Sequence, residues 1–166
     1  MSLEEKYNFN NFIQRIYINE SGKDLYAMFS KGENLVKWFV KNSSYHTETG
    51  ELRNNNESFK TNDEYLWEWT DGAKLAGKIL EADGKENFKF TFGNDVTIHL
   101  KLIKAGSRTL VELTQLQNIP DYEMRFENYM ACFPGWSFYL INLKSICEGG
   151  IDLREKNPDI ELLVNI

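Results

Sequence analysis

The chain has 166 residues and a net charge of −6, and 42% of it is hydrophobic, with 14% aromatic. This length suits one domain, and the hydrophobic fraction is too high for a disordered chain. The acidic charge argues against nucleic acid and anionic membranes as partners, because both are bound through lysine and arginine.

The chain carries few targeting or redox signals. No apolar run approaches the ~20 residues that span a bilayer, and the N-terminus lacks the apolar stretch of a signal peptide. Cys132 and Cys147 form no close metal-type pair. We therefore expect a cytoplasmic protein without a membrane partner, with two free, buried and inert thiols.

The first third of the chain predicts a strand followed by two short helices. Residues 8–19 alternate imperfectly between apolar and polar, which indicates a strand with a bulge or extra twist. One helix starts at Ser21, and the next carries Leu35, Trp38 and Phe39 at the i, i+3, i+4 spacing of an apolar face. Trp38 and Phe39 would form either a lid or a permanent plug at the open end of the fold. Residues 44–49 are a further strand candidate.

Residues 64–114 predict a regular meander. Five segments alternate apolar and polar residues, and short turns join them at Asp71-Gly72, Asp83-Gly84, Gly93-Asn94 and Gly106-Ser107. Asp-Gly is a strong hairpin signal, so consecutive segments should pair as antiparallel strands. One face of the sheet should be apolar and the other wet. The whole pattern predicts an α+β fold with a sheet of about six to seven strands.

The last third predicts a long closing helix. Asp121 suits an N-cap for a first helical piece. Because Pro134 fits poorly in a helix interior, we expect a break near residues 132–133 and a new helix from Phe133 to Gly149. The apolar stripe of this helix comprises Trp136, Leu140, Leu143 and Cys147.

Large aromatic rings crowd the inward face of the predicted sheet. They either line an apolar ligand pocket between sheet and helix or fill a solid core. Gln115 continues the inward register, and would be either a polar anchor at the pocket mouth or an exposed side chain at a fraying strand end. The candidate ligand-binding residues are Trp38, Tyr65, Trp67, Trp69, Phe88, Phe90, Phe92, Val111, Leu113, Gln115, Trp136 and Leu140.

No catalytic motif accompanies this apolar set. His46 and His99 lie among polar residues, without the positioned partners that general acid–base catalysis needs. Zinc-type spacing, nucleophile elbows and phosphate-binding loops do not occur. We therefore predict no catalytic residue, no metal site and no cofactor.

The order of elements resembles the helix-grip fold of the START-like (SRPBCC) superfamily, a curved antiparallel sheet wrapped around a long C-terminal helix. Within it, the chain resembles the family named for the activator of the heat-shock-protein-90 ATPase. This resemblance covers roughly residues 8–153. The residues that carry it are Leu35–Phe39, Leu75–Glu81, Phe88–Phe92, Thr109–Leu113, Gly135-Trp136, Leu140–Lys144 and Glu148-Gly149.

This resemblance implies one START-like domain over residues 1–166, with a core of about 8–153 and an extension, 154–166, that would add a strand or serve a homodimer. The superfamily includes lipid and hormone binders, cyclases and co-chaperone domains. Chaperone-activating members work with an additional N-terminal domain, and its absence here argues against a chaperone partner.

The leading functional hypothesis is a non-enzymatic domain that binds a small hydrophobic or amphipathic molecule between sheet and helix. The second is a chaperone-associated or other protein-interaction module, which would need an exposed apolar patch such as Phe138 and Ile141. These two side chains point away from the apolar stripe, toward the preceding helical piece, another chain or solvent. The third hypothesis is a cyclase- or hydrolase-like enzyme.

Overall fold

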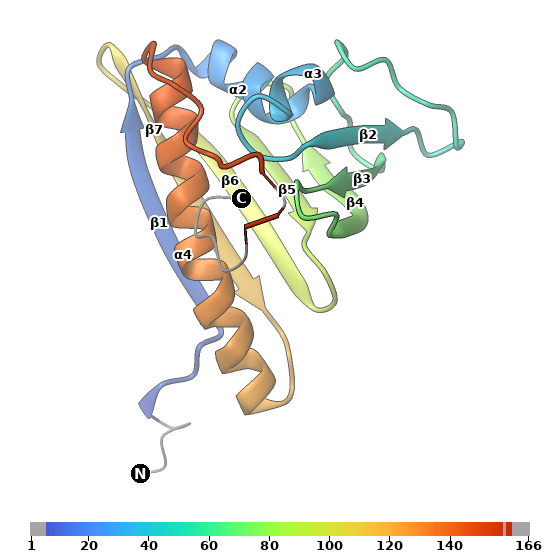
Figure 1. Cartoon of the computed structure of the whole chain (residues 1–166), viewed down its shortest axis with the longest axis vertical. Helices are drawn as coiled ribbons and strands as arrows, with labels where there is room; N and C mark the ends of the chain where they lie inside the picture. Colours follow the sequence, from blue (N-terminus) through green and yellow to red (C-terminus); the bar gives the residue numbers. More distant parts are fainter. Residues whose placement is uncertain (1–5, 158, 161–166) are drawn as a thin grey trace.

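The computed structural model describes residues 6–157, 159 and 160. A seven-stranded antiparallel sheet in the order β1-β7-β6-β5-β4-β3-β2 forms one layer, and helix α4 lies across one of its faces (Figure 1). This confirms the α+β helix-grip prediction. The elements are β1 (Asn11–Ile18), α2 (Gly22–Ser30), α3 (Gly32–Leu35), β2 (Asn42–His46), β3 (Glu64–Glu68), β4 (Lys74–Ala82), β5 (Asn87–Thr91), β6 (Val96–Ala105), β7 (Arg108–Gln117) and α4 (Tyr122–Cys147).

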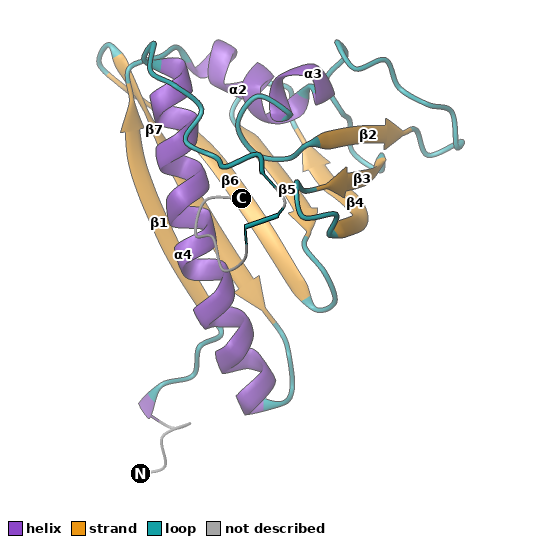
Figure 2. Cartoon of the chain, in the orientation of Figure 1, coloured by secondary structure: helices purple, strands orange, loops and turns teal. Residues whose placement is uncertain are grey.

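The meander from β3 to β7 has the predicted antiparallel pairing. Its turns place glycines in the left-handed region, with φ of 86° at Gly72 and 65° at Gly106, where a residue without Cβ is favoured. The two short helices stand at one end of the sheet, and the edge strand β2 leads into a long loop before β3 (Figure 2).

The predicted break before Pro134 is wrong, because α4 is one continuous helix of 26 residues with the proline inside it. Proline removes only one helix hydrogen bond, the one to the carbonyl of Met130. Just beyond it, the Phe133 carbonyl accepts hydrogen bonds from Ser137 Oγ at 2.9 Å and from Gln14 Nε2 of β1 at 2.8 Å. Packing and these bonds hold the helix together across the proline.

The bulge expected in the first strand is also absent, since β1 pairs with β7 in unbroken register from Asn11 to Ile18. Its alternation looks imperfect because Gln14 occupies an inward position among apolar residues, where it binds α4. The irregular register lies elsewhere, between Ile79 and Glu81 of β4.

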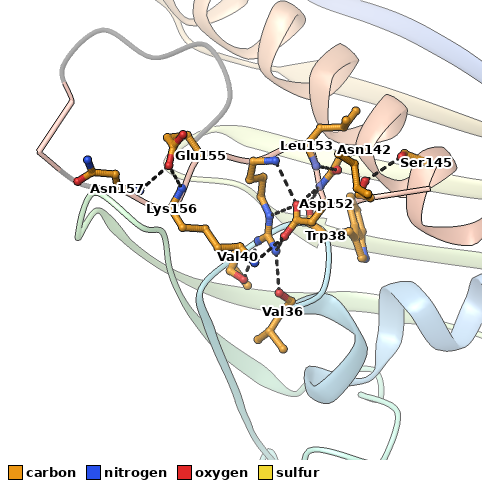
Figure 3. A network of polar contacts seen from close by, with 12 residues as sticks. Val36, Trp38, Val40, Asn142, Ser145, Asp152, Leu153, Glu155, Lys156 and Asn157 are labelled. Carbon is orange, nitrogen blue, oxygen red and sulfur yellow. Dashed lines mark hydrogen bonds and ion pairs between the residues drawn. The ribbon is translucent and has the colours of Figure 1, made fainter. Parts of the chain in front are cut away.

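The segment after α4 turns back across the fold toward the region between α3 and β2 (Figure 1). Residues 151–157 form no strand, so this part of the predicted extension does not enlarge the sheet. Residues 158 and 161–166 lie outside the described part of the chain. Asp152 of this segment accepts a hydrogen bond from the Asn142 side chain of α4 (Figure 3). Arg154 donates to a backbone carbonyl group of the core, that of Val40.

Among the described helices, none has the length and apolar character needed to cross a membrane.

Candidate functional site

The space between the sheet and α4 is almost completely filled. The interior void, a gap among the core rings, has a volume of about 10 Å³. A cavity needs roughly 10–15 Å³ to hold one water molecule. The interior is therefore a packed core, as the second of the two sequence interpretations had it. The void is lined by Phe29, Leu35, Trp38, Phe39, Phe59, Trp67, Phe88, Phe90, Leu100 and Trp136.

Direct ring contacts account for this filling. Tyr65 and Trp67 of β3 stack with centroids 3.8 Å apart, and Phe90 meets the edge of Trp67 at 5.4 Å. Trp38 and Phe39 are 1% and 2% exposed, so they plug the end of the fold and do not form an open lid. Aromatic pairs in such offset and edge-to-face arrangements stabilise the core beyond their buried area.

A second cavity opens beside α4, and we call it the α4 groove. Its volume is about 200 Å³, and its walls are almost entirely apolar. Trp69 and Phe92 extend the inward registers of β3 and β5 past the ends of those strands, where they are half-buried. The residues that line the groove are Phe39, Trp69, Phe92, Ala131, Cys132, Gly135, Trp136 and Tyr139.

Two ionisable side chains border the α4 groove, and both are neutral at physiological pH. Burial raises the pKa of Tyr139 to about 12, although a hydrogen bond with Trp69 acts in the opposite direction. Burial likewise raises the pKa of the Cys132 thiol. A protonated thiol is a poor nucleophile, so the groove offers apolar surface and hydrogen-bonding groups in place of charge.

A buried polar network lies behind the groove. Gln115 and Gln117 are both buried, which rules out the exposed strand end considered for Gln115. Trp136 Nε1 donates to Gln115 Oε1 at 3.1 Å, and Asn128 Nδ2 donates to Gln117 Oε1 at 2.6 Å. These bonds fix the Trp136 ring in the groove wall, because turning it away would leave a buried amide oxygen without a donor.

The structure separates the predicted ligand-binding residues into two groups. Trp69, Phe92 and Trp136 line the α4 groove. Gln115 lies behind it, bonded to Trp136. The remaining residues belong to the packed core, namely Trp38, Tyr65, Trp67, Phe88, Phe90, Val111, Leu113 and Leu140.

Apart from Trp136, sequence reasoning missed the α4 residues that line the groove. Ala131, Gly135 and Tyr139 are spaced four apart, so they share one face of a continuous helix. Ala131 and Gly135 have small side chains and so leave space beside the helix, and the Tyr139 ring forms one end of that space. This signal was present in the sequence, but the expected break at residues 132–133 placed Ala131 and Gly135 on different helices.

Another hollow, of about 860 Å³, lies between the start of α2 and the β4–β5 and β6–β7 turns. Its rim mixes lysines such as Lys23 and Lys85 with carboxylates such as Asp24 and Glu86. Side chains of both charges therefore line this hollow.

The two histidines do not serve the groove. His99 lies on the outer sheet face beside Thr97 and Lys101. Its pKa is lowered mainly by burial and, to a smaller extent, by repulsion from nearby lysines. His46 belongs to the edge strand β2. Within the described part of the chain, no cluster of three or more histidine, cysteine, aspartate or glutamate side chains could hold a metal ion.

Several apolar residues on one side of α4 are exposed to solvent, although Phe126 and Phe133 also contact Phe9 and Phe12 at the start of the chain. Phe126, Met130 and Ile141 are 40%, 55% and 52% exposed. Phe133, at the heptad spacing from Phe126, is also exposed. Phe138 is half-buried against Tyr139, so only Ile141 of the two patch residues predicted from the sequence is open to solvent.

Comparison with known proteins places this architecture in a family. The family described as Activator of Hsp90 ATPase homolog 1-like protein matches residues 21–148, well over half of the chain. The chain belongs to this family. The match begins at the N-cap of α2 and ends at the C-cap of α4, so it includes every residue of the α4 groove. None of the curated proteins compared with the chain matched it.

Several solved structures share the helix-grip fold with this chain. A protein from Staphylococcus saprophyticus has a TM-score of 0.67 at 16% identity, over 87% of this chain and 96% of that one. The Aha1 dimer from Colwellia psychrerythraea has a TM-score of 0.66 at 18% identity, over 84% and 97%. Protein MLL2253 from Mesorhizobium loti has a TM-score of 0.67 at 10% identity, over 84% and 97%. These similarities confirm the START-like helix-grip fold.

Proposed function

We propose that this family member binds a small, neutral, apolar molecule in the α4 groove and carries out no chemistry on it. The observation that supports this most directly is the groove itself, a hollow of about 200 Å³ with apolar walls. Soluble proteins usually fill such hollows, as this one has filled its interior. An apolar recess bordered by half-buried rings is typical of a ligand site.

The volume limits the size of the ligand. A cavity of about 150 Å³ holds benzene, whereas drug-sized ligands occupy roughly 300–1,000 Å³. At about 200 Å³, the groove fits one aromatic ring with a short substituent, or the end of an alkyl chain. The Trp69 and Tyr139 rings would contact its sides, and its polar end would face solvent.

Gly135 allows a direct test, because a Cβ at this position would meet no heavy atom within 4 Å. A leucine at residue 135 would fill the groove, whereas an alanine would leave most of it open. Both replace a glycine in a helix interior, which by itself stabilises a helix by about 1 kcal/mol. Loss of binding in Gly135→Leu therefore cannot be attributed to unfolding.

The measurement is titration of fluorobenzene, followed by fluorine NMR. We expect saturable binding at one site, weakened by at least about tenfold in Gly135→Leu and by less than about threefold in Gly135→Ala. Absence of binding to the wild-type protein, or equal binding by both variants, would contradict the proposal.

A protein-interaction role is the second candidate, because the exposed apolar residues on α4 include Phe126, Met130, Phe133 and Ile141. Contiguous apolar surface of this kind often marks an interface, and the relative from Colwellia psychrerythraea is a dimer. In this role the surface would pair two copies of the chain. Light scattering over a concentration series tests it: the wild-type mass should rise toward twice the monomer mass, and Met130→Glu should remain monomeric.

A further inference from the structure

A single pair of rings separates the α4 groove from the interior void. Phe39 and Trp136 line both cavities. They stack with centroids 5.3 Å apart and planes 14° from parallel. Phe39 also contacts Trp69 at 5.5 Å and Tyr139 at 4.8 Å, so its ring closes the inner end of the groove. Displacing that ring would join the two spaces.

Phe39 belongs to a segment that is neither helix nor strand, residues Val36–Val40, which we call the plug segment. Side chains from outside it hold its carbonyl groups. Arg154 Nη2 donates to the Val36 carbonyl at 2.9 Å and Nη1 to the Val40 carbonyl at 3.0 Å. Asn142 Nδ2 of α4 donates to the Trp38 carbonyl at 2.8 Å (Figure 3).

The donors to the plug segment are themselves fixed by residues Asp152–Arg154, which we call the strap. Asp152 accepts from Arg154 Nη2 at 2.8 Å and from Asn142 Nδ2 at 3.0 Å. The Leu153 amide donates to Asn142 Oδ1 at 2.7 Å (Figure 3). The Arg154 side chain is only 6% exposed, so it is committed to these contacts.

The Asp152 carboxylate of the strap accepts several hydrogen bonds. Burial alone would raise the pKa of Asp152, but hydrogen bonds from Arg154 and Asn142 lower it far below the usual range of an aspartate. The carboxylate is therefore charged at physiological pH. Displacement of the chain after Gly150, or of the plug segment by a ligand, would separate the strap from the plug segment.

We propose that the strap acts as a latch on the plug segment, and that Phe39 thereby sets the length of apolar ligand that the protein accepts. With the strap in place, the groove ends at the Phe39 ring and takes only short ligands. With the strap released, the ring moves aside and the groove continues toward the core, where an unbranched alkyl chain can enter. This inference rests on the proposed function of the α4 groove.

Three variants separate the parts of the latch. Arg154→Met removes the two bonds that Arg154 itself donates to carbonyl groups of the plug segment, and residue 154 is not among those that line the groove. Lys156→Met is the matched control, because the Lys156 side chain is 70% exposed and forms an ion pair with Asp152, at 3.2 Å, without bonding to the plug segment carbonyl groups that Arg154 holds. Phe39→Ala removes the partition itself. If the last variant fails to fold, the first two still decide the question.

The binding assay uses n-butanol, n-hexanol, n-octanol and n-decanol, with tryptophan fluorescence as the readout because Trp69 and Trp136 line the groove. Each methylene buried should strengthen binding by about fourfold. We expect this gain to stop at a short chain in the wild type and in Lys156→Met, and to continue to longer alcohols in Arg154→Met and Phe39→Ala. The same limiting length in the wild type and Arg154→Met would overturn the proposal.

Hydrogen exchange tests the latch without any ligand. The Trp38 and Phe39 amides donate to the Leu35 carbonyl at 3.3 and 3.0 Å, and they should exchange faster in Arg154→Met than in Lys156→Met. Unchanged exchange in Arg154→Met overturns the latch. Faster exchange in a protein that binds no alcohol in any form supports the latch and overturns only the proposed function, so the two failures are distinct.

Discussion

Alanine at Gly77 should destabilise the protein strongly, because the Tyr65 ring crosses directly over this glycine. The two residues are paired across β3 and β4. A Cβ at residue 77 would lie 2.5 Å from Tyr65 Cζ and 2.6 Å from Thr91 Oγ1, where real Cβ contacts stay above 3.0 Å. Tyr65 cannot retreat, since Trp67 stacks behind it at 3.8 Å and its hydroxyl donates to the Thr91 carbonyl.

The size of the effect follows from three contributions to the free energy of unfolding. Overpacking a filled core costs about 1–3 kcal/mol, and losing the tyrosine hydrogen bond costs about 1 kcal/mol. Replacing glycine inside a strand returns about 0.5–1 kcal/mol. The net loss for Gly77→Ala is about 2 kcal/mol, which lowers the melting temperature by roughly 4–8 °C in a domain of this size.

Urea denaturation followed by circular dichroism measures this change, and Gly135→Ala is the matched control. The same substitution at Gly135 meets no heavy atom within 4 Å, so it should raise stability by about 1 kcal/mol. Adding Tyr65→Phe to Gly77→Ala removes one of the clashing atoms and should produce a coupling of at least about 0.5 kcal/mol. The reasoning fails if Gly77→Ala is as stable as the wild type, or if both glycine variants shift stability in the same direction.

Three further outcomes follow from buried charge and from titration. Arg53→Met should lower the free energy of unfolding, measured by urea denaturation, by about 3–5 kcal/mol, because it leaves Asp63 buried without the bidentate partner it holds at 2.7 and 2.8 Å. Loss of the exposed ion pair between Arg15 and Glu112 should lower it by less than about 1 kcal/mol. Since burial holds the folded pKa of His99 below 6.5, the unfolded chain takes up the proton first, so stability should fall as the pH drops through 6.5, and His99→Gln should reduce that loss. Burial raises the pKa of Cys147 to about 11, so iodoacetamide at pH 8 should modify it at least about tenfold more slowly in the native protein than in urea.

Local patterns were sufficient for the architecture. Alternating residues in 64–114 and Asp-Gly turns determine strand pairing because side chains of a strand point to opposite faces and tight turns restrict register. The errors arose where a distant contact overrides a local preference. Gln14, which spoils the alternation of β1, bonds to α4, and the same contact supports the helix beside Pro134.

The site was only partly accessible to such reasoning. Trp69, Phe92 and Trp136 could be placed at the groove because each follows a simple periodicity along its own element. Phe39 was expected only as a lid or plug at the end of the fold. Its place in the groove wall depends on a segment that is held by Arg154, more than a hundred residues away. A periodic pattern within one helix or strand cannot predict a contact between residues so far apart in the sequence.

The sequence by itself determined which face of each strand carries the rings, and hence that a curved sheet closes on an aromatic interior. Only the tertiary structure decided that this interior is full and that the remaining space lies beside α4. The physical reason is that the periodicity of a strand or helix specifies the direction in which each side chain points. The volume of a cavity, by contrast, is a small difference between the space that the backbone encloses and the volume of the side chains that fill it. That difference depends on how the plug segment and the strap, far apart in the chain, pack against the same helix.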